Sequence, residues 1–290
     1  MKLEIGNKKL MGRNLISYFS LLCASLVLVS CAQPAQLTPA VAPTPAQVNA
    51  AEAQTHLDAA KTALRAGDLA KAQTEAKAAT TANPQSSDAF YVLGNVYNQQ
   101  AIGLADEGQR QDVFTKALEA YQKAISLNPK NDAALVNLGT VYYQNGQFDE
   151  ALKNVQAGLA INPNDATTQY ILGTIYLQQD PATKPGVVDS ARAAFEKAIQ
   201  LDPKMAVAYT GLATVLLFKN DYTNAKVNAQ KAVDLAPGSK DPYVYWALAQ
   251  AQCQSNDFVN GAKTIALINS LNPQDARFKT QVQTLAARCK

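Results

Sequence analysis

Residues 132–165 read DAALVNLGTVYYQNGQFDEALKNVQAGLAINPND, and this stretch decides the fold. Gly139 and Ala151 place small side chains on either side of Gly146, a turn former that is followed by the apolar Phe148. Small side chains let two antiparallel helices approach closely. Pro163 ends the second helix, because proline lacks an amide hydrogen and its ring clashes with the preceding turn. The stretch therefore predicts a helical hairpin.

The same pattern recurs along the chain from residue 51. Prolines follow one another at intervals of 45, 34, 40, 34 and 36 residues, and two columns of small residues precede them. When the six segments that end in these prolines are aligned, small residues fall at the same positions in each, so we expect six hairpins. The prolines are Pro84, Pro129, Pro163, Pro203, Pro237 and Pro273; the first small column is Ala60, Gly94, Gly139, Gly173, Ala213 and Ala249, and the second is Ala72, Ala117, Ala151, Ala191, Ala225 and Gly261.

These columns resemble the tetratricopeptide repeat family over residues 53–273. The resemblance implies an all-α fold, a right-handed superhelix (α-solenoid) whose concave wall is lined by the first helix of each hairpin. Residues 276–289 are expected to form a capping helix on the last hairpin. The expected repeats, within a domain of residues 51–290, are 53–86, 87–131, 132–165, 166–205, 206–239 and 242–275.

Residues 1–30 are typical of an export signal, in which basic residues precede an apolar stretch that is short for a membrane span. The stretch ends in Leu28-Val29-Ser30-Cys31, which resembles a lipobox. In a lipobox the cysteine receives a diacylglycerol thioether, and the signal is removed before it. We therefore expect lipidation at Cys31. An ordinary cleaved signal with a coincidental cysteine is the alternative.

Residues 31–50 are expected to be a lipidated cysteine followed by a tether, because residues 32–50 carry four prolines and no charge. The residue directly after Cys31 is Ala32 and not aspartate, and in this the chain resembles lipoproteins that are released to the outer membrane. In other envelopes the anchor would sit on the outer face of the inner membrane. Translation starts at Met1 or at Met11, and both starts give the same mature protein.

Composition and charge exclude several classes of function. The net charge of +3 belongs to residues 1–30, and the rest of the chain holds 22 basic and 22 acidic residues. A neutral chain has no broad attraction for nucleic acid. The single histidine, His56, is expected to be a packing or surface residue, and the sequence contains no Cys-x-x-Cys motif and no phosphate-binding glycine loop. We expect no enzyme activity, no cofactor and no metal site.

The repeat register predicts the residues of the concave wall. They are mostly uncharged Tyr, Thr, Asn and Gln, which can hydrogen-bond an extended peptide and offer aromatic contact area. A merely solvated wall is the alternative. The wall lacks the Lys-and-Asn cluster with which some family members bind a terminal carboxylate. Its residues are Tyr91, Asn95, Asn98 and Gln99; Val136, Thr140, Tyr143 and Gln144; Tyr170, Thr174, Leu177 and Gln178; Thr210, Thr214 and Phe218; and Trp246 and Gln250.

Two repeats are longer than the rest, around residues 99–110 and 180–190. The first insertion is long enough to extend both helices of its hairpin, and the second contains prolines and is expected to be a loop. Each is either tolerated length variation or a rim that contacts a partner.

Cys253 and Cys289 are the thiols that remain once the signal is removed and Cys31 is lipidated. Cys253 lies near the end of a first helix, and the capping helix takes the place of the next first helix. The two cysteines should therefore meet at the same end of the stack, and exported proteins favour pairing. We expect a disulfide, with two unpaired cysteines as the alternative.

A lipid anchor, a spacer and six repeats together resemble the pilotin lipoproteins of type IV pili and other envelope lipoproteins of the repeat family. The sequence thus predicts an exported, membrane-anchored scaffold that binds and positions envelope proteins through a neutral concave wall. A ligand-binding module for cell-wall peptide or glycan is the alternative.

Overall fold

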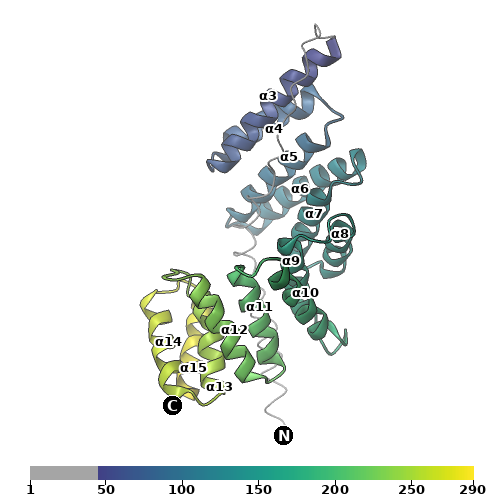
Figure 1. Ribbon diagram of the computed structural model, residues 1–290. Coiled ribbons are helices and arrows are strands. Elements are labelled where there is room, and N and C mark those ends of the chain that lie inside the picture. The colour runs from purple at the N-terminus through teal and green to yellow at the C-terminus, as the bar shows by residue number, and fades with distance from the viewer. Residues whose placement is uncertain (1–44) are drawn as a thin grey trace. The chain divides into compact units, whose positions relative to one another are not determined.

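The computed structural model describes residues 45–290, and in that range the chain folds into thirteen α-helices without a strand. The expected all-α class is confirmed. The described residues form two compact units, an N-terminal unit of residues 45–163 and a C-terminal unit of residues 164–290 (Figure 1).

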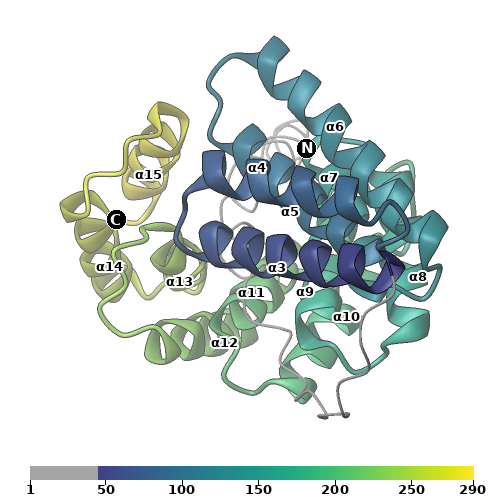
Figure 2. The same ribbon diagram turned by 90° about the horizontal axis from the view of Figure 1, so that it is seen from above.

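The N-terminal unit holds three helical hairpins, and the C-terminal unit holds three more and a last single helix (Figures 1 and 2). Within each unit, every first helix packs against its own second helix and also contacts the first helix of the next hairpin. The N-terminal hairpins are α3 (Pro45–Arg65) with α4 (Leu69–Ala82), α5 (Ser87–Ile102) with α6 (Glu107–Leu127), and α7 (Asp132–Gln144) with α8 (Phe148–Ile161). The C-terminal hairpins are α9 (Ala166–Gln178) with α10 (Val187–Leu201), α11 (Ala206–Phe218) with α12 (Tyr222–Leu235), and α13 (Tyr243–Gln254) with α14 (Phe258–Ser270), followed by α15 (Ala276–Arg288).

Local sequence sets the ends of these helices. The second helices α4, α6, α8 and α10 each end two residues before the proline of their repeat, as the sequence predicts. Aspartate, serine or asparagine caps many of the starts, and Asp106, for example, accepts a hydrogen bond from the backbone N–H of Gln109. The turns use a left-handed residue, as expected, at Gly67, Gly146, Asn220 and Asn256.

Small residues let the two helices of a hairpin approach closely. A Cβ atom added at Gly139 of α7 would lie 2.7 Å from Val155 Cγ2 and 2.9 Å from the carbonyl oxygen of Ala151, both in α8. No side chain fits in that space. Ala151 and Val155 are themselves fully buried, so the expected role of this small-residue column is confirmed.

The expected extended tether is too long at its carboxyl end, because α3 already begins at Pro45 rather than after residue 50. Proline is well tolerated in the first turn of a helix, where its missing N–H has no partner to lose. The next residues, Ala46 to Glu52, contain no proline. Cys31 and the rest of residues 1–44 lie outside the described range.

The two insertions have different structures. The first lengthens its hairpin, since α5 runs to Ile102 and α6 begins at Glu107. The second forms an irregular loop from Gln179 to Gly186, with Gly186 in the left-handed conformation. Among the described helices, none is both long and apolar enough to cross a membrane.

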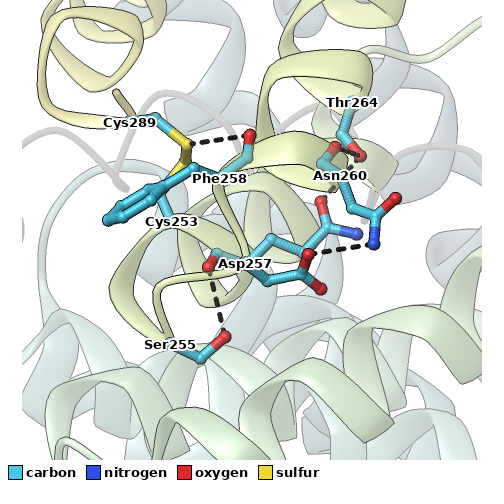
Figure 3. The surroundings of a disulfide bond; sticks show 8 residues. Cys253, Ser255, Asp257, Phe258, Asn260, Thr264 and Cys289 are labelled. Carbon is cyan, nitrogen blue, oxygen red and sulfur yellow. Dashed lines mark hydrogen bonds between the residues drawn. A yellow bond between two sulfur atoms is a disulfide. The ribbon is translucent and has the colours of Figure 1, made fainter.

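The last helix, α15, packs on α13 and α14 and is linked to α13 by a disulfide (Figure 3). Cys253 and Cys289 are joined with their Cα atoms 5.0 Å apart, which is the pairing expected from the sequence. Gly261 of α14 lies against this bridge, because a Cβ atom there would be 2.5 Å from Cys289 Sγ and 2.7 Å from Cys253 Sγ. The second small-residue column has alanine in the other five repeats and glycine at position 261, because the disulfide leaves no room for a Cβ atom there.

Candidate partner-binding surface

A buried hydrogen-bond network joins three helices of the N-terminal unit. Asn95 Oδ1 of α5 accepts hydrogen bonds from the Tyr121 hydroxyl of α6 and from Asn137 Nδ2 of α7, both at 2.7 Å. Burial raises the pKa of Tyr121 well above its ordinary value, and the nearby Tyr91 adds to the effect. Asn95, expected to face a partner, therefore uses its side-chain oxygen to hold the hairpins together.

Asn137 is a polar wall residue that the repeat register missed. It is 5% exposed and also lies 3.4 Å from the Tyr91 hydroxyl, to which its Nδ2 donates. A single amide in the otherwise apolar run Leu135 to Gly139 is the signal that could have identified it, because buried amides need partners.

Near the carboxyl ends of α5 and α7, three side-chain amides each have one atom that lacks a hydrogen-bond partner within residues 45–290. Asn98 Oδ1, Gln144 Oε1 and Asn145 Nδ2 are buried and have no hydrogen-bond partner among the described residues. Such atoms are unfavourable in a folded protein unless a ligand or solvent completes them. Asn98 and Gln144 were predicted to lie on the wall. Gln99, which follows Asn98 in the chain and was also predicted for the wall, is half-buried.

Three further predictions in α7 need correction. Val136 faces α8 rather than a partner, because its Cγ2 lies only 2.6 Å from where a Cβ atom at Gly158 would be. The Thr140 hydroxyl donates to the carbonyl oxygen of Val136 in its own helix. The Tyr143 ring packs 6.0 Å from the Phe148 ring of α8, and its residue is 4% exposed. Repeat register gives the side of a helix but not the partner of each side chain.

In the C-terminal unit we define the C-terminal wall as the register positions on α9, α11 and α13. Threonine hydroxyls on this wall donate to backbone carbonyl groups four residues earlier, as Thr174 does to Tyr170 and Thr214 does to Thr210. Their hydrogens are therefore not available to a ligand. The C-terminal wall consists of Tyr170, Thr174, Leu177, Gln178, Thr210, Thr214, Phe218, Trp246 and Gln250.

Two aromatic residues of the C-terminal wall also stabilise the fold. The Tyr170 ring lies 5.9 Å from the Phe195 ring of α10, and Tyr170 is 1% exposed. Trp246 packs edge-on against Phe278 of α15, with ring centroids 5.3 Å apart. Replacing either ring would disturb packing between helices, so neither is a clean reporter of partner binding.

Gln178, the last residue of α9, is a wall residue whose side-chain amide forms no hydrogen bond to the described residues through either of its polar atoms. It is 8% exposed, and both its Oε1 and its Nε2 are buried without a hydrogen-bond partner in the part of the chain that the structure describes. A carboxamide carries two N–H donors and an oxygen acceptor, but the two Gln178 atoms have less than 1 Å² of accessible surface in this conformation. Gln250 is also buried, at 9% exposure.

In the three hairpins of the C-terminal unit, charged residues lie on the second helices and not on the first helices. The first helices α9, α11 and α13 contain no Asp, Glu, Lys or Arg, whereas the second helices α10, α12 and α14 all contain at least one. Lys219, directly after α11, pairs with Asp189 of α10. The C-terminal wall is therefore an uncharged surface with polar amides.

No catalytic or metal-binding arrangement stands out in residues 45–290. His56 is half-buried in α3, and its Nδ1 lies 2.7 Å from Glu75 Oε2 of α4, which makes it a packing contact between two helices. The described residues contain no group of three or more His, Cys, Asp and Glu side chains that could hold a metal ion.

Solved structures share this fold at low sequence identity. PilF of Pseudomonas aeruginosa superposes with a TM-score of 0.66 at 18% identity, over 80% of this chain and 97% of its own. A chain of the APC/C hetero-tetramer Cut9–Hcn1 gives a TM-score of 0.66 at 18% identity, over 82% of this chain and 43% of its own. MamA of Desulfovibrio magneticus, from residue 41 to its end, gives 0.52 at 22% identity, over 65% of this chain and 98% of its own. At these identities the likeness shows the fold alone.

Sequence comparison agrees with the structure. No curated protein has a significant match to the chain. Family models described as "Tetratricopeptide repeat" match residues 57–107, 110–175 and 206–239, which together cover just over half of the 290 residues. With the hairpin pattern, the small-residue columns and the proline-terminated second helices, these matches establish that the chain belongs to the tetratricopeptide repeat family.

Proposed function

We propose that this protein is a membrane-anchored scaffold that binds and positions other proteins of the cell envelope through the first helices of its hairpins. The tetratricopeptide repeat fold is that of a protein–protein interaction scaffold. The observation that carries the finer proposal is the set of buried, unpartnered amide atoms on first helices, at Asn98, Gln144 and Gln178. The unpartnered atoms have no accessible surface as they stand, so these amides bind a polar ligand by turning their side chains toward it.

Membrane anchoring rests on the sequence Leu28-Val29-Ser30-Cys31. Acyl chains on Cys31 would hold the chain at a membrane, because two or more chains bind far more firmly than one. The expected mature protein begins at an acylated Cys31, which mass spectrometry of the purified protein measures. A Cys31→Ser variant should leave the membrane fraction, and a variant that stays there as firmly as the parent contradicts the anchor.

Partner binding is tested by affinity capture from detergent-solubilised envelopes after crosslinking in the cell. A triple variant, Asn98→Ala with Gln144→Ala and Gln178→Ala, should lose the captured partner because it loses the unmet amide atoms. The matched control replaces three amides of second helices, Asn154, Gln200 and Gln230, with alanine. It should capture the partner as the parent does.

Two outcomes contradict the proposal. One is equal loss of capture in both triple variants, which would place the binding surface on the second helices or make the loss unspecific. The other is a protein that captures no partner protein but retains soluble peptidoglycan fragments, which favours the ligand-binding alternative.

A further inference from the structure

We infer that the outer face of α14, together with the basic residues of α15 and its carboxyl end, docks on the surface of an anionic lipid bilayer. We call this surface the terminal face. The inference goes beyond partner binding by the first helices, and it rests on the proposed function for the Cys31 anchor that keeps the chain near a membrane. Three observations carry it: exposed positive charge without partners, an apolar strip on α14, and a disulfide that holds the two together.

The first observation is the position of the positive charge. The N-terminal unit contains 9 basic and 12 acidic residues, whereas the C-terminal unit contains 13 basic and 10 acidic residues. The basic excess lies in residues 258–290, which hold five basic residues and one acidic residue, Asp275. All five basic side chains are exposed, and no ion pair within residues 45–290 involves them. They are Lys263, Arg277, Lys279, Arg288 and Lys290.

The second observation is an apolar strip along the outer face of α14. Val259 is 70% exposed and Leu267 is 41% exposed, and Lys263 stands midway between them, four residues from each. The exposed Ala262 and Ala266 lie beside this row. The aliphatic stem of a lysine can lie along such a strip while its ammonium group reaches outward to a phosphate.

The strip is not a general feature of second helices. In α10 the corresponding positions, counted from its own small residue Ala191, are the exposed Asp189, Arg192 and Glu196. In α14 these positions hold the valine and the two alanines of the strip. Apolar side chains flanked by basic residues are typical of helices that lie at a lipid interface, where the former enter the acyl boundary and the latter meet anionic headgroups.

The third observation is that the disulfide holds basic residues against the strip. Cys289 Sγ lies 3.9 Å from the carbonyl oxygen of Phe258 in the first turn of α14 (Figure 3). Arg288 and Lys290 flank Cys289 in the chain, and Val259 directly follows Phe258. The bridge therefore keeps two cations beside the amino end of the strip. The carboxyl end of α14 leads through a short connection to the start of α15, where two more cations lie.

A bilayer fits these features better than a second copy of the chain does. Each basic side chain near an anionic membrane strengthens binding about fivefold, and the exposed valine and leucine add apolar contact. Such docking is weak alone, but the Cys31 tether would raise the effective concentration of the terminal face at the membrane. The acidic excess of an N-terminal unit is small and interspersed with basic residues, so a second copy offers little complementary charge.

The one tryptophan of the chain provides the readout. Trp246 packs against Phe278 of α15 and therefore reports the position of the terminal face. The lipidated full chain is bound to vesicles with a dansyl headgroup acceptor, made of phosphatidylcholine with or without phosphatidylglycerol. Energy transfer from Trp246 should be larger on the anionic vesicles, and high salt should lower it toward the value on neutral vesicles.

Two pairs of variants locate the contact. Glutamine at four positions of the terminal face should lower the ratio of docked to free chain at least tenfold, whereas glutamine at four exposed lysines of α4, α6 and α8 should leave it unchanged. The first set is Lys263, Arg277, Arg288 and Lys290, and the control set is Lys71, Lys77, Lys116 and Lys153. Val259→Asn should lower the transfer that remains at high salt, and Val227→Asn on α12, where the valine is 61% exposed, should not.

The outcomes separate this inference from the anchor. Equal transfer on neutral and anionic vesicles, for a chain that floats with both, would overturn the docking and leave the anchor in place. Equal loss of transfer in both four-charge variants would also overturn it, as would salt-sensitive dimers in detergent that the terminal-face variant abolishes, because the face would then bind a second copy. A chain that floats with anionic vesicles alone would support the docking and contradict the anchor, and one that floats with neither would contradict both.

Discussion

The two units use their polar side chains in different ways. In the N-terminal unit, the Asn95 oxygen is occupied by Tyr121 and Asn137, so that an amide of a first helix ties three helices together. In the C-terminal unit, a disulfide and the Trp246–Phe278 contact join α13 to α15. The Gln178 amide has no partner among the described residues, as is also true of the amide oxygens of Asn98 and Gln144 in the N-terminal unit. The comparison teaches that an amide on a first helix can hold hairpins together at one register position, as Asn95 does, and lack a hydrogen-bond partner at another, as Gln178 does.

The largest expected effect is the loss of the disulfide from the C-terminal unit. The double variant Cys253→Ala with Cys289→Ala should lower the free energy of unfolding by about 4 kcal/mol in the chain-entropy treatment of a loop of this length, less any relief of strain. Hydrogen exchange should show that amides of α15 lose protection, because α15 is the last helix and packs on α13 and α14. Amides of α5 and α7 should keep their protection; if they lose it equally, the two units do not depend on different contacts.

The next effect is expected in the N-terminal unit. Gly139→Leu should destabilise the fold by about 1–3 kcal/mol or more, because the new side chain overlaps Val155 and the backbone of Ala151. Thermal melts compare it with Gly108→Leu, whose site in the first turn of α6 is exposed and has only Asp106 Oδ1 within reach, at 3.4 Å. The control should match or slightly exceed the parent, since leucine is the better helix former. Equal melting of both variants would place Gly139 outside the helix interface.

A smaller effect tests the buried network itself. Tyr121→Phe should lower stability by about 1 kcal/mol, because the ring is kept and only the hydrogen bond to Asn95 is lost. Tyr222→Phe is the matched control, since the Tyr222 hydroxyl bonds to Asn220 at the exposed surface, and denaturant unfolding should find it close to the parent. If the two variants lose stability equally, burial of the network contributes nothing.

The same tyrosine predicts a weak dependence on alkaline pH. The pKa of Tyr121 is raised in the fold by burial, above the value of 10.0 for the unfolded chain. The folded state therefore resists ionisation, and its stability should decline as the pH rises above 10 toward the folded pKa. Tyr121→Phe should show a shallower decline in this range than the parent does. Parallel stability curves for the two proteins would contradict the assigned cause.

The repeating columns predicted the hairpins well because they report backbone packing. Proline ends a helix through its own ring and its missing N–H, and a small residue allows close helix contact through its own size. Their positions in the sequence therefore predict where helices end and where they touch, even when the neighbouring side chains are unknown. The side-chain partners could not be predicted in this way. Register put Val136 and Tyr170 on the wall, but Val136 packs toward Gly158 and the Tyr170 ring lies near Phe195.

These packing contacts also change an expectation about partner binding. The sequence predicts that aromatic wall residues offer contact area to a partner. In the structure, Tyr170→Ala would leave a cavity beside Phe195, and Trp246→Ala would remove a contact with Phe278. Loss of a buried aromatic ring typically costs several kcal/mol. Amide substitutions such as Gln178→Met are therefore the cleaner probes.

The central claim is that partners bind to the first helices of the hairpins. A photo-reactive benzoyl-phenylalanine placed at Phe218, a half-buried wall position on α11, tests it directly in living cells. The comparison position is Val227 on α12 of the same hairpin, which is 61% exposed. The account predicts that light produces a protein crosslink from position 218 and little or none from position 227. A crosslink to the same partner from position 227, with none from position 218, would contradict it.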